Sequence, residues 1–223
     1  MGVERTWMSW SGGKDAALAL ERLRADPGVE VTGLLTTASA VRGVVPYQEV
    51  GVDLIAAQAE ALGLPLHLLR LPEPCPNAEY EAALAPALAA ATDDGVTAVA
   101  FGDLALADVR AYREALVAGA GLAARFPLWG EATDDLADQL LEAGIAATLT
   151  CVDTAQAPAW LAGRAYDATL LADLPVGVDP CGERGEFHTF VTDAPGFAAP
   201  VAVETGAVTE RGGYAVCDLV LTR

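Results

Sequence analysis

The chain is poor in basic residues, and this shortage excludes several classes of partner. Thirteen lysines and arginines stand against 31 aspartates and glutamates, so the 223 residues carry a formal net charge of −18 at pH 7. A charge of this sign repels nucleic-acid phosphates and anionic lipid head groups at long range. We therefore expect binding to neither nucleic acids nor membrane surfaces.

Paired cysteines and long apolar runs are also missing. The four cysteines, at positions 75, 151, 181 and 217, form no CxxC pair, which argues against a structural zinc site or a redox dithiol. No apolar stretch approaches the length needed to cross a bilayer, and the first ten residues do not resemble a signal peptide. These absences predict a soluble, reduced, cytoplasmic protein.

What the chain does contain is an alternation of β-prone and helical segments, which is typical of parallel strands joined by crossover helices and predicts an α/β fold. Predicted strands are residues 6–10, 30–36, 66–71, 97–101, 122–126 and 146–152, the last continuing the same sheet. Predicted helices are residues 16–25, 52–62, 77–91, 106–118 and 134–143, with short helices at 158–161 and 167–171. Pro86 should kink or split the third helix. Residues 187–191, 201–204 and 214–221 read as antiparallel strands of a different region.

A glycine-rich segment, residues 9–15 (SWSGGKD), lies between the first predicted strand and the first predicted helix. Backbone N–H groups and the helix dipole point at whatever occupies such a loop, which favours an anion. Gly12 and Gly13 permit close approach, Ser11 offers a hydroxyl donor, and Lys14 adds a positive charge. The segment therefore predicts a polyphosphate site.

A second segment, residues 179–191 (DPCGERGEFHTFV), concentrates titratable groups in a turn that leads into a strand. Such density suits a reaction site. Alternation along a strand would place Glu186 and His188 on one face and Phe187 in the core. The alternative interpretation is a surface turn followed by an ordinary hairpin strand.

These segments resemble known proteins. Residues 11–15 resemble the SGGxDS loop of the PP-loop ATP pyrophosphatases, the adenine nucleotide alpha-hydrolase superfamily, with Ala16 in place of the final serine. Together with residues 102–103 (GD), 127–130 (PLWG) and 182–191 (GERGEFHTFV), they resemble the diphthine-ammonia ligase family in order and spacing. The resemblance covers nearly the whole chain.

The resemblance implies a Rossmann-like (HUP-type) parallel sheet with helices on both faces at residues 1–125, followed by a smaller C-terminal α+β domain at residues 126–223. Characterised family members use ATP to activate a carboxylate, release pyrophosphate, and let ammonia displace AMP to give an amide. ATP, Mg²⁺ and ammonium are thus the implied partners. The acceptor would be a carboxylate, diphthine on elongation factor two if the source is archaeal or eukaryotic, and the chain could form a homo-oligomer.

The resemblance also implies roles for individual residues. The phosphates would be held by Ser9, Ser11, Gly12, Gly13 and Lys14. Adenine would meet the backbone of Leu35, Thr36 and Thr37, and Gly102 would let the ligand approach. Magnesium would bind Asp15 and Asp103, and the catalytic set would comprise Asp103, Glu183, Glu186 and His188. Either Glu186 or His188 would orient or deprotonate ammonium.

Three alternatives stay open. Because Ala16 and residues 38–52 depart from the family pattern, the chain could be a regulatory module that binds ATP or AMP without catalysis. A PP-loop enzyme that transfers sulfur to tRNA would need a basic surface and paired cysteines, which this sequence lacks. Asp103 could simply cap the helix that follows it.

Overall fold

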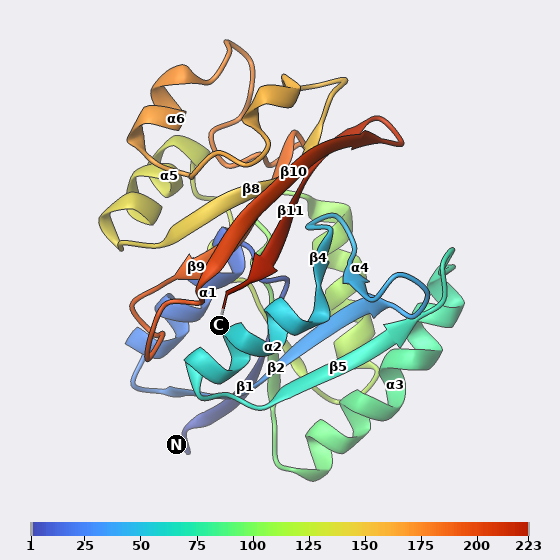
Figure 1. The fold of residues 1–223 in the computed structure, drawn as a ribbon. Coiled ribbons are helices and arrows are strands. Elements are labelled where there is room, and N and C mark those ends of the chain that lie inside the picture. Colours follow the sequence, from blue (N-terminus) through green and yellow to red (C-terminus); the bar gives the residue numbers. More distant parts are fainter. Residues whose placement is uncertain (1, 223) are drawn as a thin grey trace.

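The computed structural model describes residues 2–222, and the first half of the chain forms a five-stranded parallel sheet (Figure 1). Its strands are Glu4–Ser9 (β1), Val29–Ser39 (β2), Leu66–Leu71 (β5), Ala98–Ala100 (β6) and Ala123–Arg125 (β7). The order across the sheet is β5-β2-β1-β6-β7. Strand order reverses between β1 and β6, and open α/β sheets bind ligands at such a switch point.

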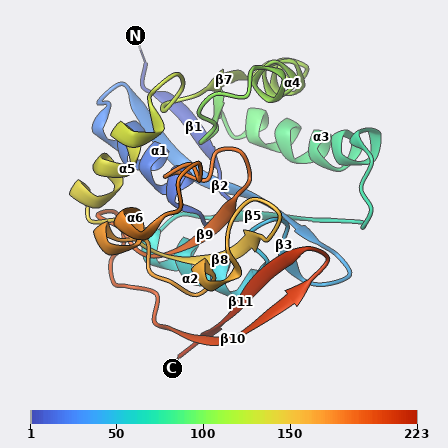
Figure 2. The same cartoon turned by 90° about the horizontal axis from the view of Figure 1, so that it is seen from above.

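Helices cover both faces of this sheet. One face carries Lys14–Ala25 (α1) and Val52–Leu62 (α2), and the other carries Asn77–Asp93 (α3) and Ala107–Ala118 (α4). Figure 2 shows α3 and α4 on the side away from α2. The predicted Rossmann-like fold, with a smaller C-terminal domain, is confirmed.

The second half of the chain forms an antiparallel sheet of order β10-β11-β8-β9. Its strands are Ala146–Asp153 (β8), Phe187–Asp193 (β9), Val203–Arg211 (β10) and Tyr214–Leu221 (β11). The helices of this half are Thr133–Glu142 (α5), the 3-10 turn Ala159–Leu161 and Ala168–Asp173 (α6). A short hairpin, Val44–Val45 (β3) with Val50–Gly51 (β4), projects from the first half.

The two halves share one apolar core. A single cluster of buried residues joins Leu20 of α1 and Ile55 of α2 to Leu140 of α5 and Phe190 of β9. Helix α1 packs against β2 and against β9, so it contacts both sheets. The start of α1, where the glycine-rich loop ends, is therefore held from two sides. The proposed division between residues 125 and 126 stays a prediction.

One expectation about the sheets is wrong. Residues 146–152 do not continue the parallel sheet, because β8 pairs antiparallel with β9 and β11 instead. Of the kink or split expected at Pro86, the split does not occur, because α3 runs from Asn77 to Asp93 without a break. Pro86 lies on the exposed side of α3, where water can satisfy the carbonyl that loses its N–H partner. The strand expected at residues 201–204 instead runs from Val203 to Arg211.

No helix among residues 2–222 has the length and apolar character that a membrane crossing requires.

Candidate functional site

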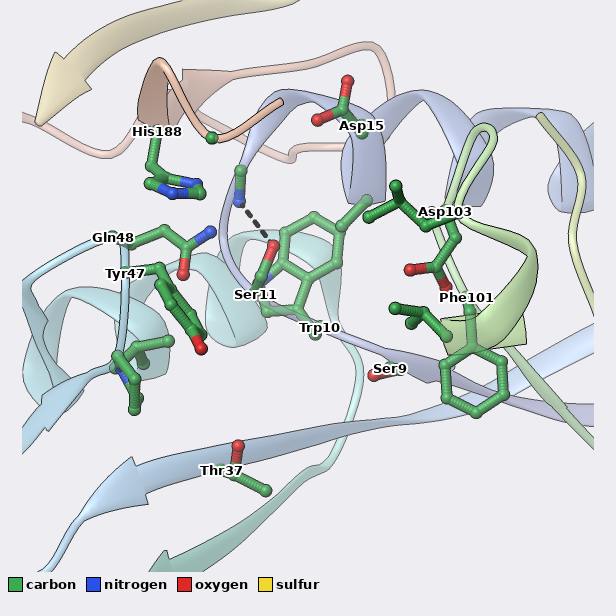
Figure 3. A pocket seen from close by; sticks show the side chains of 18 of the residues that line it. Ser9, Trp10, Ser11, Asp15, Thr37, Tyr47, Gln48, Phe101, Asp103 and His188 are labelled. Carbon is green, nitrogen blue, oxygen red and sulfur yellow. Dashed lines mark hydrogen bonds between the residues drawn. The ribbon is translucent and has the colours of Figure 1, made fainter. Parts of the chain in front are cut away.

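A cavity of about 1190 Å³ opens at the carboxyl ends of β1, β2 and β6. Figure 3 shows Ser9 and Ser11 between two walls, with Asp103 on one side and His188 and Tyr47 on the other. The cavity therefore brings together the glycine-rich loop, the end of β6 and the start of β9. These segments are far apart in the sequence, and each was predicted to contribute to the site.

The glycine-rich loop is packed closely from behind. Gly12 has φ +81°, and a Cβ at this position would lie 2.6 Å from Ile55 Cδ1 and 2.8 Å from Gln58 Oε1. A Cβ on Gly13 would lie 3.2 Å from the carbonyl oxygen of Thr189. Here the glycines let the loop lie against α2 and β9. The prediction had assigned them only to close approach by a ligand.

Lys14 links this loop to the turn that precedes β9. Its ammonium donates to both carboxylate oxygens of Asp15, at 2.9 Å each, and to the carbonyl of Cys181. The rings of Tyr166 and Phe187 lie 5.7 and 5.6 Å from Nζ. Burial acts to lower the pKa of Lys14, but Asp15 and neighbouring acidic groups outweigh it and raise the pKa above its ordinary value. Lys14 is thus charged, with its three donors in use.

Asp103 and Glu183 both line the cavity, and Glu183 contacts the segment just after Asp103. Glu183 Oε1 accepts a hydrogen bond of 3.2 Å from the N–H of Ala105. Burial, together with Asp15, raises the pKa of Glu183 to about 7. Burial also raises the pKa of Asp103, although Arg113 acts in the opposite direction. The pKa of Glu183 is therefore close to neutral pH, where its carboxyl group can both accept and release a proton.

Asp103 also has an incompletely satisfied oxygen. Arg113 Nη1 lies 3.2 Å from Asp103 Oδ2, yet this buried oxygen makes no hydrogen bond of acceptable geometry within the described part of the chain. A poorly aligned donor at this distance leaves the lone pairs of the oxygen available. A cation could coordinate such an oxygen.

Glu186 lies outside the cavity. Its buried carboxylate accepts hydrogen bonds from the backbone N–H groups of Asp179, at 2.9 Å, and Arg184, at 3.0 Å, and from the Arg184 guanidinium. The residue is 2% exposed and does not line the cavity. Glu186 precedes β9 and fixes the turn in shape, so it does not share a cavity wall with His188 as the alternation had predicted.

His188 does line the cavity, from the start of β9. The ring centroids of His188 and Tyr47 are 5.6 Å apart (Figure 3). Burial, together with Lys14, lowers the pKa of His188 to about 4, so its imidazole is neutral at pH 7. Tyr47 belongs to the turn between β3 and β4 and is 69% exposed.

The end of β2 offers backbone groups to the cavity. Leu34 and Ala40 donate to carbonyls on the β5 side, so the backbone groups of odd-numbered residues face β1. The Trp10 N–H donates to the Leu35 carbonyl at 2.8 Å, so this carbonyl already has a partner. Thr37 lies beyond the end of β1. Its backbone N–H and C=O therefore face the β1 side of β2 at a point where β1 no longer pairs with it.

Not all of the predicted adenine contacts reach the cavity. Leu35 and Thr37 line it, whereas the Thr36 hydroxyl is buried and donates to the Trp10 carbonyl at 2.7 Å. Gly102 lines the cavity too, but a Cβ there would lie 3.0 Å from Ala16 N and from the Asp15 carbonyl carbon. Gly102 thus lets β6 approach the first turn of α1.

No cluster of three or more His, Cys, Asp or Glu side chains suitable for a metal occurs among residues 2–222. Magnesium commonly binds through one or two carboxylates together with substrate phosphates and water, so a protein cage is not required. Asp103, with its available Oδ2, fits such a partial site better than Asp15, whose two oxygens accept from Lys14.

The site also contains residues that the sequence interpretation missed. Tyr47 lies in a loop that departs from the family pattern, so no motif indicated it. Gln58 falls within the helix predicted at residues 52–62, and a glutamine among leucines and alanines was an available signal. Burial raises the pKa of the Cys181 thiol to about 12, which makes it unsuitable as a nucleophile at neutral pH.

Two family models match the chain. The model described as the diphthamide synthase N-terminal domain matches residues 4–124, and the model described as the diphthamide synthase C-terminal domain matches residues 132–218. Among curated proteins, none matches the chain.

Proposed function

Because the chain belongs to the diphthamide synthase family, whose members are the diphthine-ammonia ligases, we propose that it is an ATP-dependent, AMP-forming carboxylate-ammonia ligase. One observation carries the proposal. A glycine-rich loop at the switch point of a parallel sheet shares a cavity with Asp103 and Glu183. The loop is suited to binding a nucleotide, Asp103 to binding a cation, and Glu183 to proton transfer.

The proposed reaction has two steps. A carboxylate oxygen of the acceptor attacks the α-phosphorus of ATP, and the bond to the β-phosphate breaks to release pyrophosphate. Ammonia then attacks the activated carbonyl carbon, and AMP leaves with the bonding electrons while the nitrogen loses a proton. Activation is needed because a free carboxylate is a poor electrophile.

The loop would bind the phosphates mainly through its backbone. The Gly13 N–H donates a hydrogen bond of 3.2 Å to Ser11 Oγ, and both residues line the cavity at the start of α1. Lys14, buried beneath the loop, adds positive charge without exposing its ammonium. The free edge of β2 at Thr37 offers the N–H and C=O pair that a planar base such as adenine can bind.

Magnesium would bind Asp103 and phosphate oxygens, with Asp15 as a nearby negative charge. When bound, the cation would offset the negative charge that develops on the departing pyrophosphate. Asp103 Oδ2 supports this assignment because it is buried and has no well-aligned donor among residues 2–222.

Glu183 would accept the proton from ammonium or from the attacking nitrogen. Its pKa near 7 makes it a better base at neutral pH than an ordinary carboxylate. The neutral imidazole of His188 would orient ammonia from the opposite wall. Glu186 would position the turn that carries Glu183.

The test is a product analysis with purified protein, ATP, Mg²⁺ and ammonium, using elongation factor two that carries diphthine as the acceptor. We expect AMP, pyrophosphate and amide in equal amounts, with no product when the acceptor is omitted. Release of ADP and phosphate would contradict the proposal. Tight ATP binding without turnover on that acceptor would instead favour the regulatory module.

A further inference from the structure

We propose that Gln58 and Thr189 are positioning residues that aim the Gly13 N–H of the phosphate loop into the cavity. The proposal deepens the proposed function, because it concerns how the same loop is prepared for ATP. Gln58 does not line the cavity, whereas Thr189 does, with its hydroxyl already accepting from the Lys14 N–H. Both act on the backbone of the loop, Gln58 from α2 and Thr189 from β9.

Gln58 is 0% exposed, and every polar atom of its amide has a partner. Its Oε1 accepts from Trp10 Nε1 at 2.9 Å, and its Nε2 donates to the carbonyls of Gly12, at 3.1 Å, and Val191, at 2.7 Å. Because the indole N–H is only a donor, the contact with Trp10 fixes which end of the amide is oxygen. Gln58 thus joins the phosphate loop to β9.

Strand β9 completes the attachment. The Val191 N–H donates to the Gly12 carbonyl at 2.8 Å, so two donors hold that carbonyl. The Thr189 hydroxyl accepts from the Lys14 N–H at 3.1 Å in buried surroundings. Gly13, the N-terminal cap of α1, has no capping side chain, and Thr189 supplies that hydrogen bond from a distant part of the sequence.

The geometry of the peptide unit shows how these contacts determine the direction of the Gly13 N–H. The Gly12 carbonyl and the Gly13 N–H belong to one planar, trans peptide unit, in which C=O and N–H point in opposite directions. Holding the Gly12 carbonyl against α2 and β9 therefore turns the Gly13 N–H outward, toward the Ser11 hydroxyl and the cavity. The positive φ of Gly12 permits this orientation.

The experiment measures the Kd for ATP with Mg²⁺ by calorimetry, alongside the thermal midpoint of each variant. Gln58→Met should raise the Kd at least tenfold, and Thr189→Val about fivefold, because the loop then samples other peptide orientations. Thr189→Ser, which retains the hydroxyl, should stay within twofold of wild type. Thr150→Val is the matched control, since Thr150 is also buried in the antiparallel sheet and its hydroxyl contacts the His188 carbonyl.

Unchanged ATP affinity in a folded Thr189→Val protein, or failure of Thr189→Ser to restore it, would overturn the inference. A lower thermal midpoint with normal ATP affinity would indicate a purely structural role and would also overturn it. Wild-type protein that binds ATP but forms no AMP contradicts the proposed function while leaving this inference intact. If the wild type does not bind ATP, both are wrong.

Discussion

The two loops that form the cavity differ in the kind of chemistry they offer. The loop after β1 presents backbone groups and is held by packing, and its one ammonium, on Lys14, is buried and paired. The turn before β9 presents the side chain of Glu183, whose pKa is raised to about 7, and buries that of Glu186. One wall is therefore preorganised through its main chain, and the other through the environment of individual carboxylates.

The largest expected effect tests whether Glu186 shapes the second wall. Glu186→Ala should lower the free energy of unfolding by about 2–4 kcal/mol, because the N–H groups of Asp179 and Arg184 lose a buried acceptor. Chemical denaturation measures the change. Glu210→Ala removes an exposed carboxylate of β10 and should change stability by less than about 0.5 kcal/mol. Equal effects in the two variants would contradict this role for Glu186.

The next prediction tests Glu183 as the general base, separately from any role in ATP binding. Glu183→Gln should lower the rate of amide formation roughly 100-fold, since a general base contributes at least this much, and should leave ATP affinity within about twofold. Single-turnover assays at saturating ATP measure the first, and calorimetry the second. Glu204→Gln, at an exposed position of β10, serves as the control. A rate near wild type would remove Glu183 from the mechanism.

The smallest effect is a pH dependence. Only ionised Glu183 can accept a proton, so the rate should fall about tenfold per pH unit below about 7. The contribution of Glu183 to stability changes in the opposite direction, because it decreases as the pH rises. A carboxyl pKa raised above its ordinary 4.5 means that the folded state binds more protons between pH 4.5 and about 7, so this group makes folding less favourable as pH rises through that window. Glu183→Gln should abolish both dependences, and a rate profile that persists in the variant would assign the titration to another group.

The sequence predicted the first wall better than the second. Strand alternation, the glycine-rich loop and the family resemblance located β1, β2 and β6, and their carboxyl ends meet because the sheet is parallel. The strand predicted at residues 187–191 does form, as part of β9, which begins at Phe187. However, positive-φ glycines at 182 and 185 shape the turn before it, and Glu186 is directed to the N–H groups of Asp179 and Arg184. Strand periodicity carries no information about such a turn.

Contacts across long sequence separations were also beyond prediction. Gln58 falls within the helix predicted at residues 52–62, but only the fold shows that its amide contacts Gly12 and Val191. The same holds for Lys14, whose partner Cys181 lies 167 residues away. A single sequence gives the chemical character of these groups, while their neighbours depend on how two sheets pack.

The shared core has a consequence for how substrates enter. Seven residues of α1 are buried, and the cluster to which most of them belong continues into α5 and β9. Swinging the two sheets apart would expose this apolar surface to water, at a cost of roughly 25 cal/mol for each Å². A hinge between the two sheets at the candidate site is thus unfavourable. Access should instead depend on small movements of the hairpin that carries Tyr47, at the rim, with the floor of the site remaining fixed.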